Sequence, residues 1–148
     1  MQTKFFNMTK KIIGLYQLIT GVMGAIIIFA SLLNTSAAKV ALPQKVAGVV
    51  LFGLLAWAGY GLINKKRNAL KYSRILQALQ VISFSIGGTL YKFTAAGFIA
   101  LGIKNGSFTW GISAQPIDFA ITSIQNTSFS LIVYLVPLLI LIGLLRVK

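Results

Sequence analysis

The stretch "SFSIGGTLYKFTAAGF", residues 83–98, decides the fold of this chain, because a glycine pair and a lysine interrupt a long apolar run. Adjacent glycines loosen a helix, and a lysine is costly in hydrocarbon. The run extends from Ile75 to Ile103, which at about 1.5 Å per residue exceeds the roughly 30 Å of a bilayer core. We therefore expect a transmembrane helix that tilts, breaks or protrudes from the membrane.

Lys92 has two placements on such a helix. A helix that starts with the run ends near Thr94 after about twenty residues, so that Lys92 snorkels at the outer interface between two aromatic neighbours. A helix that starts near Gln80 puts Lys92 at the bilayer centre, where it costs about 2.5–3.5 kcal/mol and becomes a functional candidate. Asp118, the only acidic residue, is then its only carboxylate partner. Counting about twenty residues from the end of the preceding basic loop favours the interfacial placement of Lys92.

The rest of the chain has the composition of a polytopic membrane protein. Hydrophobic residues make up 57% of it and charged residues 10%, whereas soluble domains are about 45–50% apolar and about 25% charged. Three further apolar segments are long enough to span. The predicted fold is an all-α membrane protein, a single integral membrane domain over residues 1–148, with a four-transmembrane-helix bundle at 12–33, 46–63, 75–103 and 129–145.

The connection between the third and fourth spans, residues 104–127, has a different pattern. "FTWGISA" (108–114) and "IDFAI" (117–121) alternate apolar with polar or small residues on either side of a turn-prone "QP". Period-two alternation is typical of strands. We therefore expect a small β-hairpin in the outer loop between helices 3 and 4.

The positive charges indicate the orientation. The chain has a net charge of +13, and its cations flank apolar spans, as the positive-inside rule requires. Ten fall on the side of both termini, namely Lys4, Lys10, Lys11, Lys65, Lys66, Arg67, Lys71, Arg74, Arg146 and Lys148, against Lys39, Lys45 and Lys104 opposite. We expect a bacterial inner-membrane protein with both termini cytoplasmic, its counter-charges supplied by the anionic headgroups of the lipid bilayer and not by nucleic acid.

Small and polar residues mark the expected helix contacts. Helices in lipid associate through close packing and a few polar groups. Helix-packing positions are predicted at Gly14, Gly21, Gly24, Gly53, Gly59, Ser83 and Gly87. Gln17 and Gln80 lie at similar depths, so they either join helices by a hydrogen bond or line a path for an ion or solute.

The loop "NKKRNALKYSR", residues 64–74, is the most basic stretch of the chain. Such a loop either fixes the topology or binds anionic lipid. The candidate lipid contacts are Lys65, Lys66, Arg67, Lys71 and Arg74.

Residue types limit the chemistry. The chain has no histidine, no cysteine and one carboxylate side chain, which excludes paired-carboxylate catalysis, zinc sites and Ser-His-Asp triads within one chain. We expect no enzyme activity, no metal and no cofactor.

Three functions remain open. The first is a non-enzymatic helix-packing subunit of a homo-oligomer or of a larger membrane-protein complex. The second is an oligomeric pore or a small-solute or anion transporter lined by Gln17, Gln80 and Lys92. The third is a membrane-disrupting effector.

Overall fold

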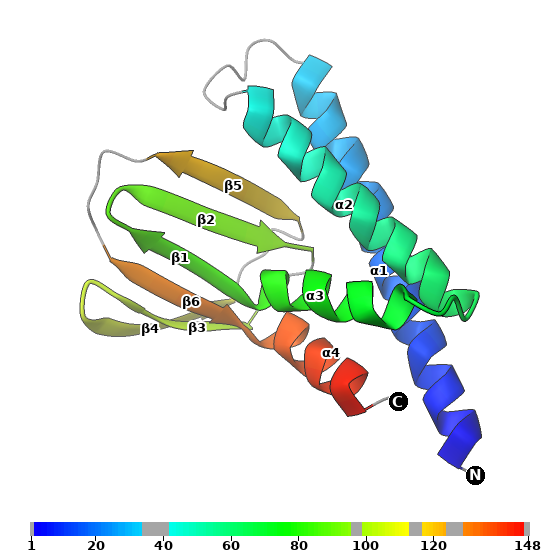
Figure 1. Ribbon diagram of the computed structural model, residues 1–148. Helices are drawn as coiled ribbons and strands as arrows, with labels where there is room; N and C mark the ends of the chain where they lie inside the picture. The colour runs from blue at the N-terminus through cyan, green and yellow to red at the C-terminus, as the bar shows by residue number, and fades with distance from the viewer. Residues whose placement is uncertain (1, 34–41, 96–98, 113–116, 124–128, 147–148) are drawn as a thin grey trace.

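The computed structural model describes residues 2–33, 42–95, 99–112, 117–123 and 129–146, which form helices and one antiparallel sheet (Figure 1). The helices are α1 (Gln2–Leu33), α2 (Leu42–Ile63), α3 (Ala69–Val81) and α4 (Leu135–Arg146). The strands are β1 (Ile82–Ile86), β2 (Thr89–Thr94), β3 (Ile99–Lys104), β4 (Ser107–Ile112), β5 (Asp118–Ser123) and β6 (Ser130–Tyr134).

Helices α1 and α2 form an antiparallel hairpin that matches the first two predicted spans. Both are long and apolar enough to cross a membrane. They pack closely because glycines remove side chains from the contact: a Cβ on Gly14 would lie 2.8 Å from the carbonyl oxygen of Gly59, and a Cβ on Gly21 would run into the backbone of Ala56. Small residues at such interfaces let helix backbones approach closely.

The third and fourth predicted spans are wrong, and with them the four-span all-α bundle. Residues 75–103 contain the end of α3 followed by strands, and residues 129–145 contain β6 followed by α4. "ISFSI" (82–86) alternates with period two, which suits a strand with one apolar face. The mean hydropathy of a window does not register that alternation, so it does not distinguish these apolar strands from a helix.

Gly87 and Gly88 form the turn that separates β1 from β2. Their φ angles are +57° and +80°, a region that glycine enters without a steric penalty. Ile86 pairs with Thr89, so the turn has two residues and left-handed backbone at both, the commonest hairpin geometry. The glycine pair therefore reverses the chain where a continuous helix was expected.

The predicted outer hairpin is also wrong in its pairing. Both of its segments contain strands, β4 and β5, but β4 pairs with β3 and β5 pairs with β2. Residues 113–116 of that segment lie outside the described residues. The alternation indicated strands correctly. Strand β4 pairs with the strand directly before it, β3, whereas the partner of β5, strand β2, lies far away in the sequence.

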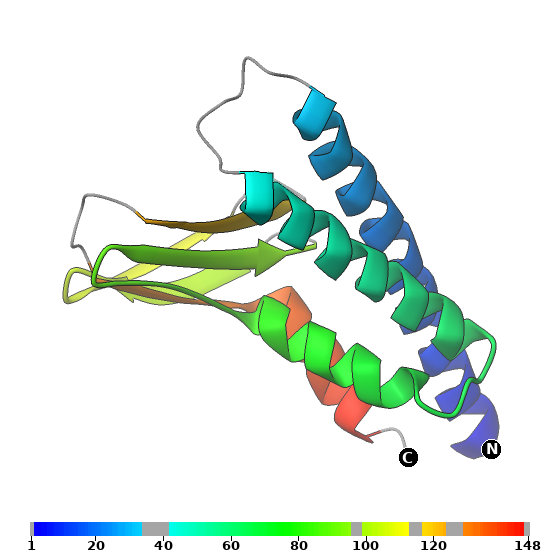
Figure 2. The same cartoon turned by 45° about the horizontal axis from the view of Figure 1, so that its top comes forward.

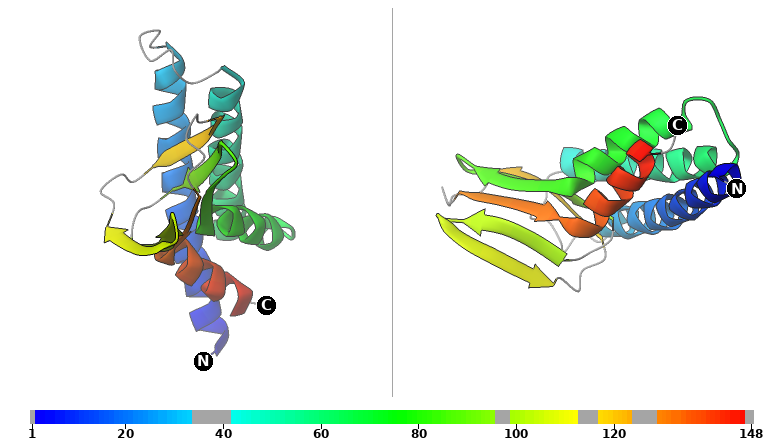
Figure 3. Two further views of the ribbon diagram at one scale, coloured as in Figure 1. Left: turned by 90° about the vertical axis from the view of Figure 1, so that its left-hand side faces the viewer. Right: turned by 90° about the horizontal axis from the view of Figure 1, so that it is seen from below.

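The sheet has the strand order β4-β3-β6-β1-β2-β5, and each strand is antiparallel to its neighbours. Seen end-on in the left view of Figure 3, it curls into an arc from β5 to β4. Helix α3 runs directly into β1, and β6 runs directly into α4. Figure 2 shows α3 and α4 leaving the same end of the sheet towards the start of α1.

Two apolar clusters hold these parts together. In the first, the Phe93 ring of β2 lies edge-on to Phe52 of α2, with ring centroids 5.1 Å apart, and near Phe119 of β5 at 6.1 Å. The second joins all four helices through buried side chains that include Leu62 and Leu144. Arg74 donates two hydrogen bonds, of 3.1 and 2.9 Å, to the Leu144 carbonyl oxygen, which satisfies a free carbonyl of the last turn of α4.

Candidate functional site

The two faces of the sheet differ sharply in chemistry. One row of directly paired positions crosses all six strands and is apolar or aromatic throughout: Phe108, Ile103, Leu131, Phe84, Tyr91 and Ile121. Alternation places the neighbouring positions on the other face. That face is mostly small or polar, with Leu90 and Ile132 as large aliphatic exceptions, and it includes Ser83, Ser85, Lys92, Thr94, Thr109, Asp118 and Ser130. We call them the apolar face and the polar face.

Helices cover only part of the apolar face. Phe93 and Phe119 pack against α2, but Phe108, Trp110 and Ile112 of β4 are 71%, 69% and 76% exposed. Soluble monomers rarely expose large contiguous apolar patches, and such patches mark membrane or protein interaction sites. This part of the sheet is therefore suited to an apolar environment.

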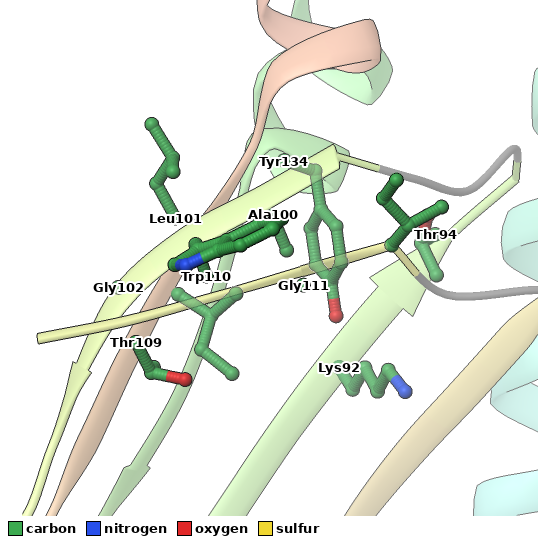
Figure 4. Close-up of a pocket in the computed structure, with 11 residues that line it drawn as sticks. Lys92, Thr94, Ala100, Leu101, Gly102, Thr109, Trp110, Gly111 and Tyr134 are labelled. Carbon is green, nitrogen blue, oxygen red and sulfur yellow. The ribbon is translucent and has the colours of Figure 1, made fainter.

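The polar face encloses a cavity of about 250 Å³ on the concave side of the arc. Side chains from opposite parts of the sheet line it: Lys92 and Thr94 from β2, Thr109 from β4, and Ile132 and Tyr134 from β6. In Figure 4 the Tyr134 ring extends from β6 towards Lys92, and Leu101 points the other way. The curl of the sheet thus makes a hollow on the polar face, which we call the polar cavity after that face. Most of its lining surface is apolar, and Lys92, Thr94, Thr109 and Tyr134 supply its polar side chains.

Lys92 forms an ion pair with Asp118 inside this region. Lys92 is paired with Ala120 and Asp118 lies two residues away on β5, so both side chains point to the polar face. Each side chain is 27% exposed. Lys92 is therefore a strand residue with a counter-charge, and neither of the two helical placements describes it.

The predicted contact between Gln17 and Gln80 is not the one that forms. Gln17 of α1 donates from Nε2 to Oε1 of Gln77, at 3.1 Å, and accepts a 2.5 Å hydrogen bond from the Ser73 hydroxyl of α3. All three side chains are fully buried. Gln80 is also fully buried, and within the described part of the chain neither of its amide atoms has a hydrogen-bond partner. Gln17 and Gln80 do not line the polar cavity with Lys92.

The predicted packing positions divide into three groups. Gly14, Gly21, Gly24 and Gly59 all lie where α1 and α2 meet within one chain. A Cβ on Gly53 would have nothing within 4 Å. Ser83 and Gly87 belong to the β1–β2 hairpin and not to a helix, so their helix-packing role is wrong. The Ser83 hydroxyl instead donates a 2.9 Å hydrogen bond to the Tyr91 carbonyl oxygen.

The basic loop gathers cations at one end of the helices. Lys65, Lys66 and Arg67 are exposed, and with Lys10 of α1 they line a cavity of about 280 Å³. The Lys66 ammonium lies 5.2 Å from the centre of the Tyr60 ring. Lys71 is exposed on α3, and Arg74 is turned towards α4. Lys10, Lys65, Lys66 and Arg67 thus form one surface, which we call the basic end, and Lys71 and Arg74 of the predicted cluster do not line its cavity.

Sequence reasoning missed Tyr134 and Thr109 as residues of the polar cavity. Period-two alternation in "SFTWGI" (107–112) was a signal for a strand, whereas "SLIVY" (130–134) has no such alternation. No protein-family model, curated protein or solved structure matches the chain. The described residues contain no group of histidine, cysteine, aspartate or glutamate side chains that could hold a metal. Within them, the polar face offers charge and hydrogen bonds without the residues of a metal site.

Proposed function

We propose that the protein is a non-enzymatic integral membrane subunit that assembles with copies of itself, the polar faces of their sheets together lining an aqueous path for small anions. The observation that carries this proposal is the separation of the sheet into an apolar and a polar face. Membrane-embedded β-structures alternate in this way, with apolar side chains towards lipid and polar side chains towards water.

Helices α1 and α2 supply the membrane anchor in this proposal. The sheet strands are too short to cross a bilayer alone, but α3 continues into β1 and β6 into α4. A helix of about 20 Å followed by a strand of about 17 Å is enough for a core of roughly 30 Å. The basic end then faces the cytoplasm of a bacterial inner membrane, in keeping with the positive-inside rule.

The sheet edges support assembly of several copies. Strands β4 and β5 each pair with one neighbour among the described residues, and open edges are not tolerated in hydrocarbon. "SFTWGI" of β4 has neither a charge nor a proline, the usual devices that protect a free edge. Because six strands alternate in direction, β4 and β5 run opposite ways, so a second copy in the same orientation extends the sheet with antiparallel pairing.

The charges of the polar face favour anions. Lys92 and Lys104 lie on this face, and Asp118 is the only acidic residue of the chain. A path with an excess of positive charge attracts anions and repels cations.

Conductance tests the path. The purified chain in a planar bilayer is expected to give currents with anion preference, and Lys92→Glu to reduce or reverse that preference, because it removes the positive charge and adds a negative one beside Asp118. The matched control is Lys11→Glu, which changes the same charge at an exposed position of α1. Currents that are absent, or equally selective in both variants, would contradict the proposed function.

Cross-linking tests the assembly. Thr109→Cys with Ala120→Cys places one thiol in the middle of each edge strand on the polar face, in a chain without other cysteines. The double variant is expected to give covalent oligomers in membranes, and each single variant to stay monomeric. Covalent dimers from a single variant would mean that like edges pair, and a cross-link confined to the monomer would mean that the sheet closes within one chain; either result contradicts this assembly.

A further inference from the structure

We infer that the structure holds a site for one anionic phospholipid between α2 and α3 at the basic end. The inference rests on the membrane placement proposed above and names a ligand for it. It is carried by two cavities that meet at one pair of aromatic side chains.

The first cavity has the chemistry of a headgroup site. It measures about 240 Å³ and is lined by Lys66, Arg67 and the polar Asn68, with Gly61 and Ala69 at its wall. Asp118 has the only acidic side chain of the chain, and it forms an ion pair with Lys92. The two cations of this cavity therefore have no carboxylate side chain in their own chain to neutralise them, and a phosphate group is a suitable counter-charge.

The second cavity is apolar and large enough to receive part of an acyl chain. It measures about 480 Å³ and lies between α2 and α3. Its aliphatic lining consists of Leu51, Leu54, Ile75, Leu76 and Leu79. Leu54, Ile75 and Leu79 are 45%, 49% and 40% exposed, so the groove is open along its side.

Trp57 and Tyr72 line both cavities. Their rings are in edge-to-face contact, with centroids 5.3 Å apart at 62°. Trp57 lies about 9 Å along the axis before the end of α2 at Ile63, the depth at which tryptophan and tyrosine concentrate between headgroups and hydrocarbon. The order from the helix end inwards is thus cations, aromatic pair and aliphatic groove.

This order matches a phospholipid from phosphate to acyl chain. A free phosphate would contact only the first cavity and a fatty chain only the second. Because the two cavities share a wall, one ligand that carries both groups uses both. An anionic phospholipid is therefore the occupant that the charge and the groove specify together.

Fluorescence quenching measures the binding. Trp110→Phe leaves Trp57 as the only tryptophan, since the chain has two. This variant is reconstituted into phosphatidylcholine vesicles that contain a small fraction of brominated phosphatidylglycerol or, in parallel, the same fraction of brominated phosphatidylcholine. Bromine quenches tryptophan on contact, so the anionic lipid is expected to quench Trp57 at a several-fold lower fraction than the zwitterionic lipid.

Two charge variants separate a built site from general attraction. Lys66→Gln with Arg67→Gln is expected to weaken the preference for phosphatidylglycerol roughly tenfold or more, given the contribution of each basic residue near a lipid surface. Lys11→Gln with Lys71→Gln removes the same charge from exposed residues that line neither cavity, and is expected to change it less than twofold. Equal losses in both variants would overturn the site in favour of diffuse attraction.

Two further arms identify the source of the phosphate and the role of the groove. Inorganic phosphate is expected not to displace the brominated lipid; displacement would mean that the first cavity binds free phosphate. Ile75→Gln, at a half-exposed position of the groove, is expected to weaken binding several-fold, and unchanged binding would remove the groove from the site.

If neither brominated lipid quenches Trp57, the membrane placement fails and the proposed function with it. Equal quenching by both lipids contradicts the lipid site alone.

Discussion

The helical hairpin and the sheet are both built from apolar residues, but they use them differently. Helices α1 and α2 are apolar around most of their circumference, and glycines bring their backbones together. The sheet is apolar on one face only, and a polar cavity lies on the other. The content of apolar residues therefore predicts burial or membrane contact in both regions. The period with which apolar residues recur along the sequence decides whether the chain forms a helix or a strand.

The difference also separates two kinds of glycine. In the hairpin of helices a glycine makes room for a neighbouring backbone, and in the sheet a glycine supplies a left-handed turn. Substitution of glycine by alanine is expected to destabilise the protein in a crowded helix contact and to stabilise it on a free helix surface. At a left-handed turn the same substitution is unfavourable.

The largest expected effect is in the helical hairpin. Gly21→Ala adds a Cβ that would meet the backbone of Ala56, whereas Gly53→Ala adds one with nothing within 4 Å. Gly21→Ala is expected to lower the free energy of unfolding by about 1–3 kcal/mol through overpacking. Gly53→Ala is expected to be neutral or to stabilise by up to about 1 kcal/mol through helix propensity. Denaturation of the reconstituted protein followed by circular dichroism measures both, and an equal change in the two variants would contradict the close contact of α1 with α2.

A smaller effect is expected at the turn of the β1–β2 hairpin. Gly87 has φ +57° and open space around its Cβ position, so Gly87→Ala should destabilise by about 1–2 kcal/mol through backbone strain alone. Gly87→Asn is the control and should cost less, since asparagine tolerates left-handed backbone. In a transmembrane helix Gly87→Ala would instead stabilise, so the sign of the change distinguishes the two folds.

The ion pair on the polar face should contribute least. Asp118→Asn leaves Lys92 without its carboxylate partner at a site where both side chains are partly exposed. The expected loss is about 1 kcal/mol, between the values typical of surface and buried pairs. A double-mutant cycle with Lys92→Met isolates the coupling of the pair, and a coupling energy of zero would mean that the contact adds nothing to stability.

The two regions also differ in how far they can be predicted. The first two helices follow directly from continuous apolar segments. The sequence names Asp118 as the only carboxylate side chain available to Lys92, but only for the helical placement at the bilayer centre that it disfavours. The polar cavity could not be foreseen, because Tyr134 reaches it only through the pairing of β6 with β1 and β3. The contact of Trp57 with Tyr72 likewise depends on how α3 folds back along α2. Such long-range pairing leaves no periodic signal in the sequence.

Cysteine accessibility tests the central claim, that water lies on one face of the sheet and lipid on the other. The naturally cysteine-free chain allows single cysteines at two pairs of neighbouring positions, Thr109 with Trp110 on β4 and Ser130 with Leu131 on β6. In reconstituted vesicles a water-soluble maleimide is expected to label cysteines at positions 109 and 130 and to spare those at 110 and 131. Equal labelling within each pair, or labelling of positions 110 and 131 alone, would contradict the account.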